Sequence, residues 1–212
     1  MMGIIAACSR GAGTGITYET FSFTSTLNGV VQIIVQYLTN DNLDITWTST
    51  GSVVSSGNSA SNIDLTGNTV SSTVTVVVAI PDGEYFGRLI LSNEGITSFD
   101  VSSNTSLEQF FTGVNYSLSV ADISNNVNLY QFTCNDTVIT AMDISNNTLL
   151  TYLAIQNTSL TSTEIDDVYI QLDNNGLSNG TLIIDISSRT SASDTASASL
   201  ITKGWSIQEP QV

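Results

Sequence analysis

Hydrophobic positions in the second half of the chain return at a nearly fixed interval, of roughly 21 residues, and polar positions return with them. Two apolar columns have this period, namely Phe86, Leu107, Leu129 and Leu150, and Leu89, Phe110, Phe132 and Leu153. An Asp-Val/Ile-Ser motif keeps the same step, with its aspartates at Asp100, Asp122 and Asp143. Such a constant period is typical of solenoids, in which each repeat forms one coil packed on the last. The pattern therefore predicts a buried apolar core and a scaffold that displays surface.

An asparagine follows each of these aspartates at the same distance, which gives a column of Asn104, Asn126 and Asn147. In a coil of this kind we expect the asparagine to be buried and to bond backbone groups of the turn. The aspartates are expected to form a structural ladder that accepts hydrogen bonds from nearby backbone or hydroxyl groups. A constant step also suggests a second polar column, made of Asn115, Asp136 and Asn157.

The first half of the chain has a different pattern, in which short strands alternate with turn formers. Residues 18–24 alternate between aromatic and polar side chains, and residues 73–80 form a Val-rich run. Short strands at this spacing predict a small, Ig-like β-sandwich over residues 17–82. An apolar, Gly-rich N-terminal arm over residues 1–16 precedes it, and the Pro-Asp-Gly sequence at 81–83 predicts the turn that ends it.

The remainder, residues 83–212, is predicted to be the repeat domain with its own C-terminal cap. A helix is expected from Ser162, because Ser and Thr followed by acidic residues suit a helix N-terminus. A strand over 181–186 and a second helix over 191–202 follow. A cap is needed because an open end would expose the apolar core. The predicted fold is thus mainly β: a sandwich, then a short solenoid closed by helix and strand.

The Asp-Val/Ile-Ser-x-Asn coils resemble the leucine-rich repeats of surface proteins from Bacteroides-like bacteria and their phages. The closing segment, from Asn179-Gly180-Thr181-Leu182 to Lys203-Gly204-Trp205, is similar to the end of such repeat domains. The resemblance covers roughly residues 86–207. It implies a role as an adhesin or a virion surface component, and it implies no catalytic residues.

Charge narrows the possible partners of the protein. The formal net charge is −15, and the cationic residues are Arg10, Arg88, Arg189 and Lys203. Nucleic-acid affinity depends on clustered Lys and Arg at phosphates, so no nucleic-acid partner is expected. Anionic membrane surfaces are disfavoured by the same argument, and no segment has the roughly 18–20 apolar residues of a membrane span.

The residue types for common catalytic chemistry are scarce. The chain has no histidine, and its two cysteines, Cys8 and Cys134, form no CxxC motif. Zinc sites of the usual kinds and Ser-His or Cys-His nucleophiles are therefore excluded. The Gly-rich stretch at 11–15 lacks the context of a phosphate loop and is interpreted as a linker. The Asp ladder offers a carboxylate pair of the kind glycosidases use, but its repetition favours a structural role.

Two further alternatives concern the first half of the chain. The turn Asn40-Asp41-Asn42-Leu43-Asp44 clusters oxygen ligands, so Ca²⁺ is an alternative to a plain turn, although no cofactor is otherwise expected. Ile5-Ala6-Ala7-Cys8 looks like a lipoprotein cleavage box, but a basic start and a long apolar run are missing. The apolar start is alternatively a segment that packs on its own domain or on a neighbouring subunit.

The function expected from these observations is a non-enzymatic structural protein of a phage virion: a head decoration, fibre or tail-associated protein. An absent export signal favours this setting, since virion proteins assemble inside the host. The N-terminal part would anchor the protein to other virion proteins or to copies of itself, and the repeats would face outward, towards a host glycan or protein. The alternative is a bacterial adhesin or carbohydrate-binding module, lipidated at Cys8. A polysaccharide-degrading enzyme is the third hypothesis.

Overall fold

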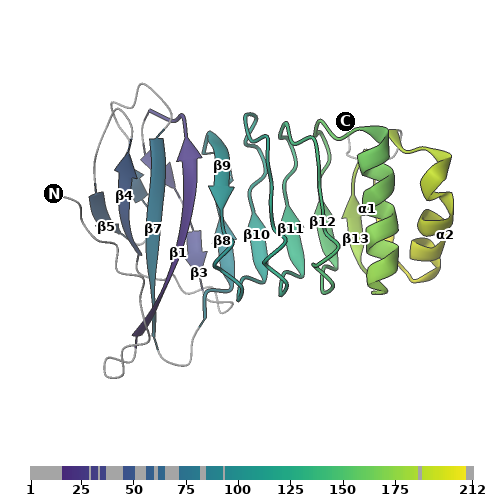
Figure 1. Ribbon diagram of the computed structural model, residues 1–212, viewed down its shortest axis with the longest axis horizontal. Coiled ribbons are helices and arrows are strands. Elements are labelled where there is room, and N and C mark those ends of the chain that lie inside the picture. Colours follow the sequence, from purple (N-terminus) through teal and green to yellow (C-terminus); the bar gives the residue numbers. More distant parts are fainter. Residues whose placement is uncertain are drawn as a thin grey trace.

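The computed structural model describes residues 16–28, 30–32, 34–36, 45–50, 56–59, 62–64, 72–81, 85–92, 94–185 and 188–208. The chain is mainly β with two helices, as predicted. Figure 1 shows an elongated molecule with long strands at one end, short parallel strands in the middle and both helices at the other end. Most of the predicted N-terminal arm with Cys8, the turn at 40–44, and Asp82 and Gly83 lie outside the described residues.

Long antiparallel strands dominate the N-terminal part. One sheet has the strand order β5 (Ser56–Ser59), β4 (Ile45–Thr50), β7 (Ser72–Pro81), β1 (Ile16–Ser25) and β9 (Ile96–Asp100). A separate pair joins β2 (Val30–Gln32) to β6 (Asn62–Asp64). In β7 and in the second half of β1 every second side chain is buried, including Phe21, Phe23, Val74, Val76, Val78 and Ile80. This alternation follows from the period-two geometry of a strand that faces the core on one side.

Hydrogen bonding continues across the predicted boundary between residues 82 and 83. Strand β9 pairs with β1, and β3 (Ile34–Gln36) pairs with β8 (Arg88–Ile90). Side chains add to these pairings, because the Glu19 carboxylate accepts hydrogen bonds from Asn104 Nδ2 at 3.0 Å and from Ser106 Oγ at 3.2 Å. The N-terminal strands and the first repeat therefore share two sheets.

A second sheet follows the sequence repeat. Its order is β3, β8, β10 (Gln109–Phe111), β11 (Gln131–Thr133), β12 (Tyr152–Ala154), β13 (Thr181–Ile183) and β14 (Ser206–Gln208), and all but β3 run in parallel. The register sets Leu89, Phe110, Phe132 and Leu153 opposite one another. Every residue of the two apolar columns is fully buried. Aromatic rings stack through this core, with Phe110 lying 4.9 Å from Phe99 and 5.6 Å from Phe132 between ring centroids.

The turns after β10, β11 and β12 each contain a residue in the left-handed region. These residues are Val114, Asp136 and Asn157, with φ of 62°, 54° and 53°. The predicted polar column placed Asn115 with Asp136, but the pairing of Phe110 with Phe132 makes Val114 the equivalent of Asp136. Asn115 is instead buried, and its Oδ1 accepts from the backbone amides of Glu94 and Ile96.

Replacing Val114 with asparagine is expected to raise the free energy of unfolding by about 1 kcal/mol, because a β-branched residue is strained at positive φ and asparagine tolerates it. Urea unfolding followed by circular dichroism measures the change. The matched control is Val127→Asn, at an exposed valine without positive φ. Equal effects of the two changes would contradict the explanation.

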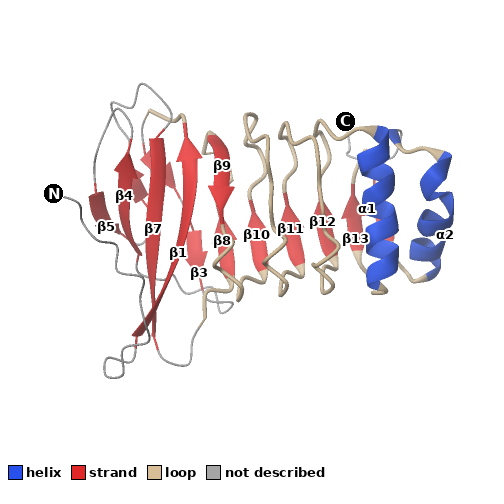
Figure 2. Cartoon of the chain, viewed as in Figure 1, coloured by secondary structure: helices blue, strands red, loops and turns tan. Residues whose placement is uncertain are grey.

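Two helices close the far end of the repeats (Figure 2). Helix α1 (Ser162–Asn175) begins after Thr161, whose hydroxyl accepts from the Glu164 amide, and ends at Gly176 with a φ of 77°. Helix α2 (Asp194–Thr202) follows a short 3₁₀ turn at 191–193. Trp205 donates from Nε1 to Leu177 O at 2.9 Å and packs so closely on Gly180 that an added Cβ would lie 2.5 Å from its ring.

Asp166 joins helix α1 to the turn that precedes helix α2. It is only 4% exposed and accepts hydrogen bonds from the Thr190 amide and from the Thr190 and Ser193 hydroxyls. Burial alone would raise the pKa of Asp166, but the hydrogen bonds from Ser193 and Thr190 and the Arg189 charge hold it below its ordinary value.

The lowered pKa of Asp166 predicts a loss of stability in acid. A carboxyl with a depressed folded-state pKa contributes stability above its unfolded-state pKa, near 4, and loses it as the pH falls through the folded-state pKa. We therefore expect Asp166→Asn to destabilise the protein at pH 7 and to reduce the difference in unfolding free energy between pH 7 and pH 2.5. Urea unfolding at pH 7 and at pH 2.5 measures this difference in unfolding free energy. The exposed neighbour Asp167 provides the control, Asp167→Asn, and an unchanged pH difference in Asp166→Asn would contradict the assignment.

Candidate functional site

The predicted aspartate ladder lies on the surface, and each carboxylate is held in its own turn. Asp100 Oδ1 accepts from Ser102 N at 3.0 Å and Ser102 Oγ at 2.7 Å, and Asp122 repeats both contacts with Ser124. Asp143 Oδ1 accepts from Ser145 N at 2.9 Å. A short acidic side chain that bonds the backbone two residues later stabilises a turn. The sequence Asp-Val/Ile-Ser thus defines the local geometry of each repeat.

These hydrogen bonds favour the ionised form of the ladder carboxylates. The pKa of Asp100 is lowered mainly by the Ser102 hydroxyl and amide, and the pKa values of Asp122 and Asp143 are lowered mainly by the amides of Ser124 and Ser145. The charge of Asp122 acts in the opposite direction on the pKa values of Asp100 and Asp143. The three carboxylates are therefore anionic at neutral pH and repel one another along the column.

The asparagine column lies inside and links successive repeats. Asn126 Nδ2 donates to Val101 O at 2.9 Å and to Asn104 O at 2.8 Å, both in the preceding repeat. Asn147 Nδ2 does the same with Ile123 O and Asn126 O, each at 3.0 Å. The three asparagines are fully buried. They hold the repeats together beneath the aspartates.

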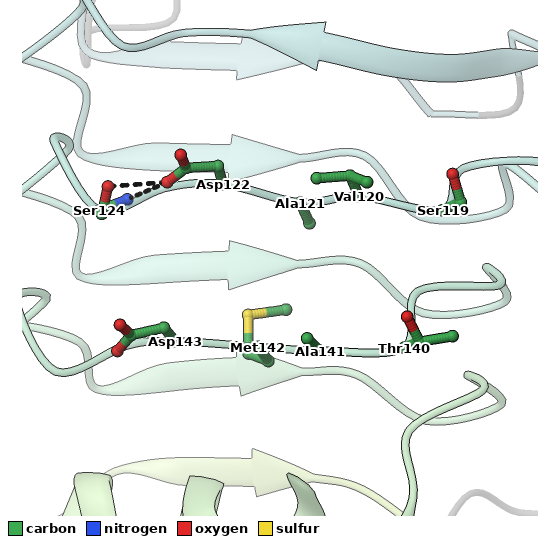
Figure 3. A pocket seen from close by; sticks show the side chains of 9 residues that line it. All are labelled: Ser119, Val120, Ala121, Asp122, Ser124, Thr140, Ala141, Met142 and Asp143. Carbon is green, nitrogen blue, oxygen red and sulfur yellow. Dashed lines mark hydrogen bonds between the residues drawn. The ribbon is translucent and has the colours of Figure 1, made fainter.

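A groove of about 360 Å³ lies between two adjacent repeats on the face of the aspartates. Its lining comes from two extended segments and consists of Ser119, Val120, Ala121, Asp122, Ser124, Thr140, Ala141, Met142 and Asp143. In Figure 3 these segments lie in front of the parallel strands, with the two carboxylates at one end and the hydroxyls of Ser119 and Thr140 at the other. The buried Ala121 and Met142 form an apolar floor, and Val120 is 63% exposed. The groove is therefore both apolar and acidic.

Two smaller hollows continue this groove along the aspartate column. One of about 290 Å³ is lined by Phe99, Asp100, Ser102, Asp122 and Asn125. The other, of about 140 Å³, is lined by Thr20, Phe21, Ser22, Thr75, Asp100 and Ser103. Asp122 lines the groove and the first hollow, and Asp100 lines both hollows. We call this series the acidic track; it runs from the repeats to the strands of the N-terminal sheet.

The outer side of the parallel sheet forms a second surface, which the sequence reasoning did not single out. The strand register aligns Arg88, Gln109, Gln131 and Tyr152 along it. Arg88 lies over the Phe111 ring at 5.2 Å, and Gln109 Nε2 donates to the Tyr130 hydroxyl. In the sequence, this surface is marked by a polar residue directly before each core Leu or Phe of the second apolar column. This sheet face combines aromatic rings with amide groups.

The described part of the chain contains neither a reactive thiol nor a metal-binding cluster of side chains. Cys134 is buried, and burial raises the pKa of its thiol to about 12. Within the described parts of the chain, no three His, Cys, Asp or Glu side chains come together in a way that could hold a metal ion. Exposed carboxylates beside apolar surface, as in the acidic track, are suited to non-covalent binding of cationic groups.

No helix in the described ranges is long and apolar enough to cross a bilayer. No protein-family model and no curated protein matches the chain. Among solved structures, it is similar to the functional domain of InlJ from Listeria monocytogenes, a leucine-rich repeat surface protein whose domain is described as including a cysteine ladder. The sequence identity is 26%, the match covers 47% of this chain and 21% of that one, and the TM-score is 0.39. At that score the likeness is distant, and the chain spans about a fifth of InlJ's matched chain.

Proposed function

We propose that this protein is a non-enzymatic structural protein that presents a binding surface. In this proposal, residues 83–212 are a leucine-rich-repeat solenoid with a C-terminal cap, and residues 17–82 are an Ig-like sandwich that anchors it. The observation that supports it best is the acidic track, in which equivalent positions of successive repeats give one continuous surface. Repeat proteins use extended surfaces of this kind for binding.

The shared sheets support the anchoring part of the proposal. Strand pairings β1–β9 and β3–β8 join the N-terminal strands to the first repeat, so the anchor and the displayed region move as one unit. We propose a phage virion as the setting, with other virion proteins or further copies of this chain as neighbours and a host glycan or protein as the ligand. The alternative setting is the surface of a bacterium, as an adhesin or carbohydrate-binding module.

Locating the protein tests the setting. Purified phage particles, host membranes and culture medium from one producing culture are analysed by quantitative mass spectrometry, with a known capsid protein and a known membrane protein as markers. Recovery in particles, in constant ratio to the capsid protein, is the expected result. Recovery with the membrane marker, and lipid on Cys8, would replace the virion by the adhesin setting.

The outer side of the parallel sheet favours the carbohydrate-binding alternative, because aromatic rings and amides together suit sugar recognition. Glycan-array binding by the purified protein tests this alternative. Tyr152→Ala would abolish binding at this face, whereas Tyr116→Ala, at a tyrosine that is 70% exposed elsewhere, would leave it intact. Binding that both variants retain would exclude the sheet face as the sugar site.

A further inference from the structure

The groove between the two repeats has distinct apolar and acidic parts. Ala121 and Met142 form its floor, Val120 and Ala141 expose further apolar surface, and the carboxylates of Asp122 and Asp143 line the same groove. Lys and Arg side chains have the same division, with an aliphatic stem that packs on apolar surface and a charged end that bonds carboxylates. The chemistry of the groove thus matches that of a long basic side chain.

The first hollow repeats this combination one step along the column. There the Phe99 ring lies beside Asp100 and Asp122. A cation over an aromatic face gains electrostatic attraction, which adds to that of the two carboxylates. Successive strands of the parallel sheet are roughly 5 Å apart, so the repeats that carry them follow one another at a similar step. Basic side chains from one extended segment therefore reach adjacent hollows.

The cationic residues that the structure describes leave this surface unneutralised. Each of the three cationic residues in the described ranges contacts other groups: Arg189 bonds Asp194 at 2.6 Å, Lys203 bonds Asp173 at 2.7 Å, and Arg88 lies over Phe111 on the parallel sheet. The ladder carboxylates instead have each other as charged neighbours, and the formal net charge is −15. A partner that brings positive charge relieves the repulsion among them.

We propose that the acidic track binds an extended polypeptide segment rich in Lys or Arg, with one basic side chain seated in the groove between Asp122 and Asp143. This inference rests on the proposed binding function and names its partner. A metal ion would leave the apolar floor unused, whereas a basic side chain contacts both parts of the groove.

Hexalysine is the probe, and Met142 reports on the groove directly. The chain has three methionines, Met1, Met2 and Met142, so protein labelled with ¹³C at the methionine methyl groups gives a simple NMR spectrum. The Met142 signal is assigned with Met142→Leu. Titration of the full chain with hexalysine at pH 7 and low salt is expected to shift the Met142 signal in a saturable manner, and hexaglutamate is expected to leave it unchanged.

Matched variants separate the groove from general charge attraction. Asp122→Asn with Asp143→Asn keeps an oxygen to accept the turn hydrogen bonds, and it is expected to weaken hexalysine binding roughly tenfold. Asp167→Asn with Glu164→Gln makes the same change of net charge on helix α1 and is expected to weaken it less than about twofold. Val120→Ser is expected to weaken hexalysine binding about threefold. Val127→Ser, at an exposed valine outside the groove, is expected to leave it almost unchanged.

Equal losses of hexalysine affinity in the two charge-matched double variants would overturn the proposal. A Met142 signal that hexalysine does not shift would overturn it as well. Binding of a glycan that depends on Asp122, with no binding of hexalysine, would overturn it in favour of a sugar ligand. Neither result bears on where the protein resides. Failure of this inference and failure of the proposed setting are therefore distinguishable.

Discussion

Phe110→Ala is expected to lower the free energy of unfolding by about 3–5 kcal/mol, because it removes a fully buried ring and leaves a cavity. The ring lies edge-on to Phe99 at 4.9 Å and is tilted against Phe132 at 5.6 Å. The substitution therefore also removes contacts between aromatic rings, which contribute about 0.5–1.5 kcal/mol each beyond their buried area. A loss of this size is a large part of the total stability of a typical domain.

Urea unfolding monitored by tryptophan fluorescence and circular dichroism measures the effect. Phe111→Ala is the control, because Phe111 is the next residue of the same strand and points to the outer side of the sheet. It is expected to cost about 1 kcal/mol, mainly through its contact with Arg88. Similar losses in the two variants would mean that the apolar columns do not form the core.

The mainly β fold and the positions of the repeated strands could be predicted because these strands recur at a nearly constant interval in the sequence. Neighbouring strands pair in register, so positions one repeat apart in the sequence become neighbours in the sheet. Leu89, Phe110, Phe132 and Leu153 therefore appear in the sequence as a periodic column and in the structure as a strand ladder. Helix α1 was also predictable, because Ser and Thr followed by acidic residues from Ser162 onwards are typical of a helix N-terminus.

Features that depend on contacts between distant segments could not be predicted in this way. The pairing of β9 with β1 places Ile96 opposite Ser25, far away in the sequence, and nothing in either strand marks its partner. Because the length of the repeat is not strictly constant, a shift by a single position is hidden, which is why Asn115 was placed with Asp136 instead of Val114. The groove requires Met142 beside Ala121; these two positions are one repeat apart, but the residue type at this position changes from Phe99 to Ala121 to Met142, so the shape of the surface there does not follow from the period.

The buried asparagines make the sharpest prediction about how the repeats are held together. Asn126→Ala removes both donors to Val101 O and Asn104 O, and it is expected to lower the free energy of unfolding by about 2–3 kcal/mol. Each carbonyl keeps one backbone bond, to Asn104 N and Leu107 N respectively, which limits the loss. The exposed neighbour Asn125 supplies the control, Asn125→Ala, for which a change below about 0.5 kcal/mol is expected.

Asn126→Asp separates hydrogen bonding from simple loss of packing, because it keeps the size of the side chain. An ionised carboxylate at this buried position would face two carbonyl oxygens without donating to them, so its folded-state pKa is expected to rise. An acid with a raised pKa destabilises the fold as the pH rises above its unfolded-state value, near 4. The variant should therefore be less stable than Asn126→Ala at pH 7 and should recover relative to it at pH 4. A stability difference between the two variants that does not change with pH would show that Asn126 acts by filling space, and that its two hydrogen bonds contribute little.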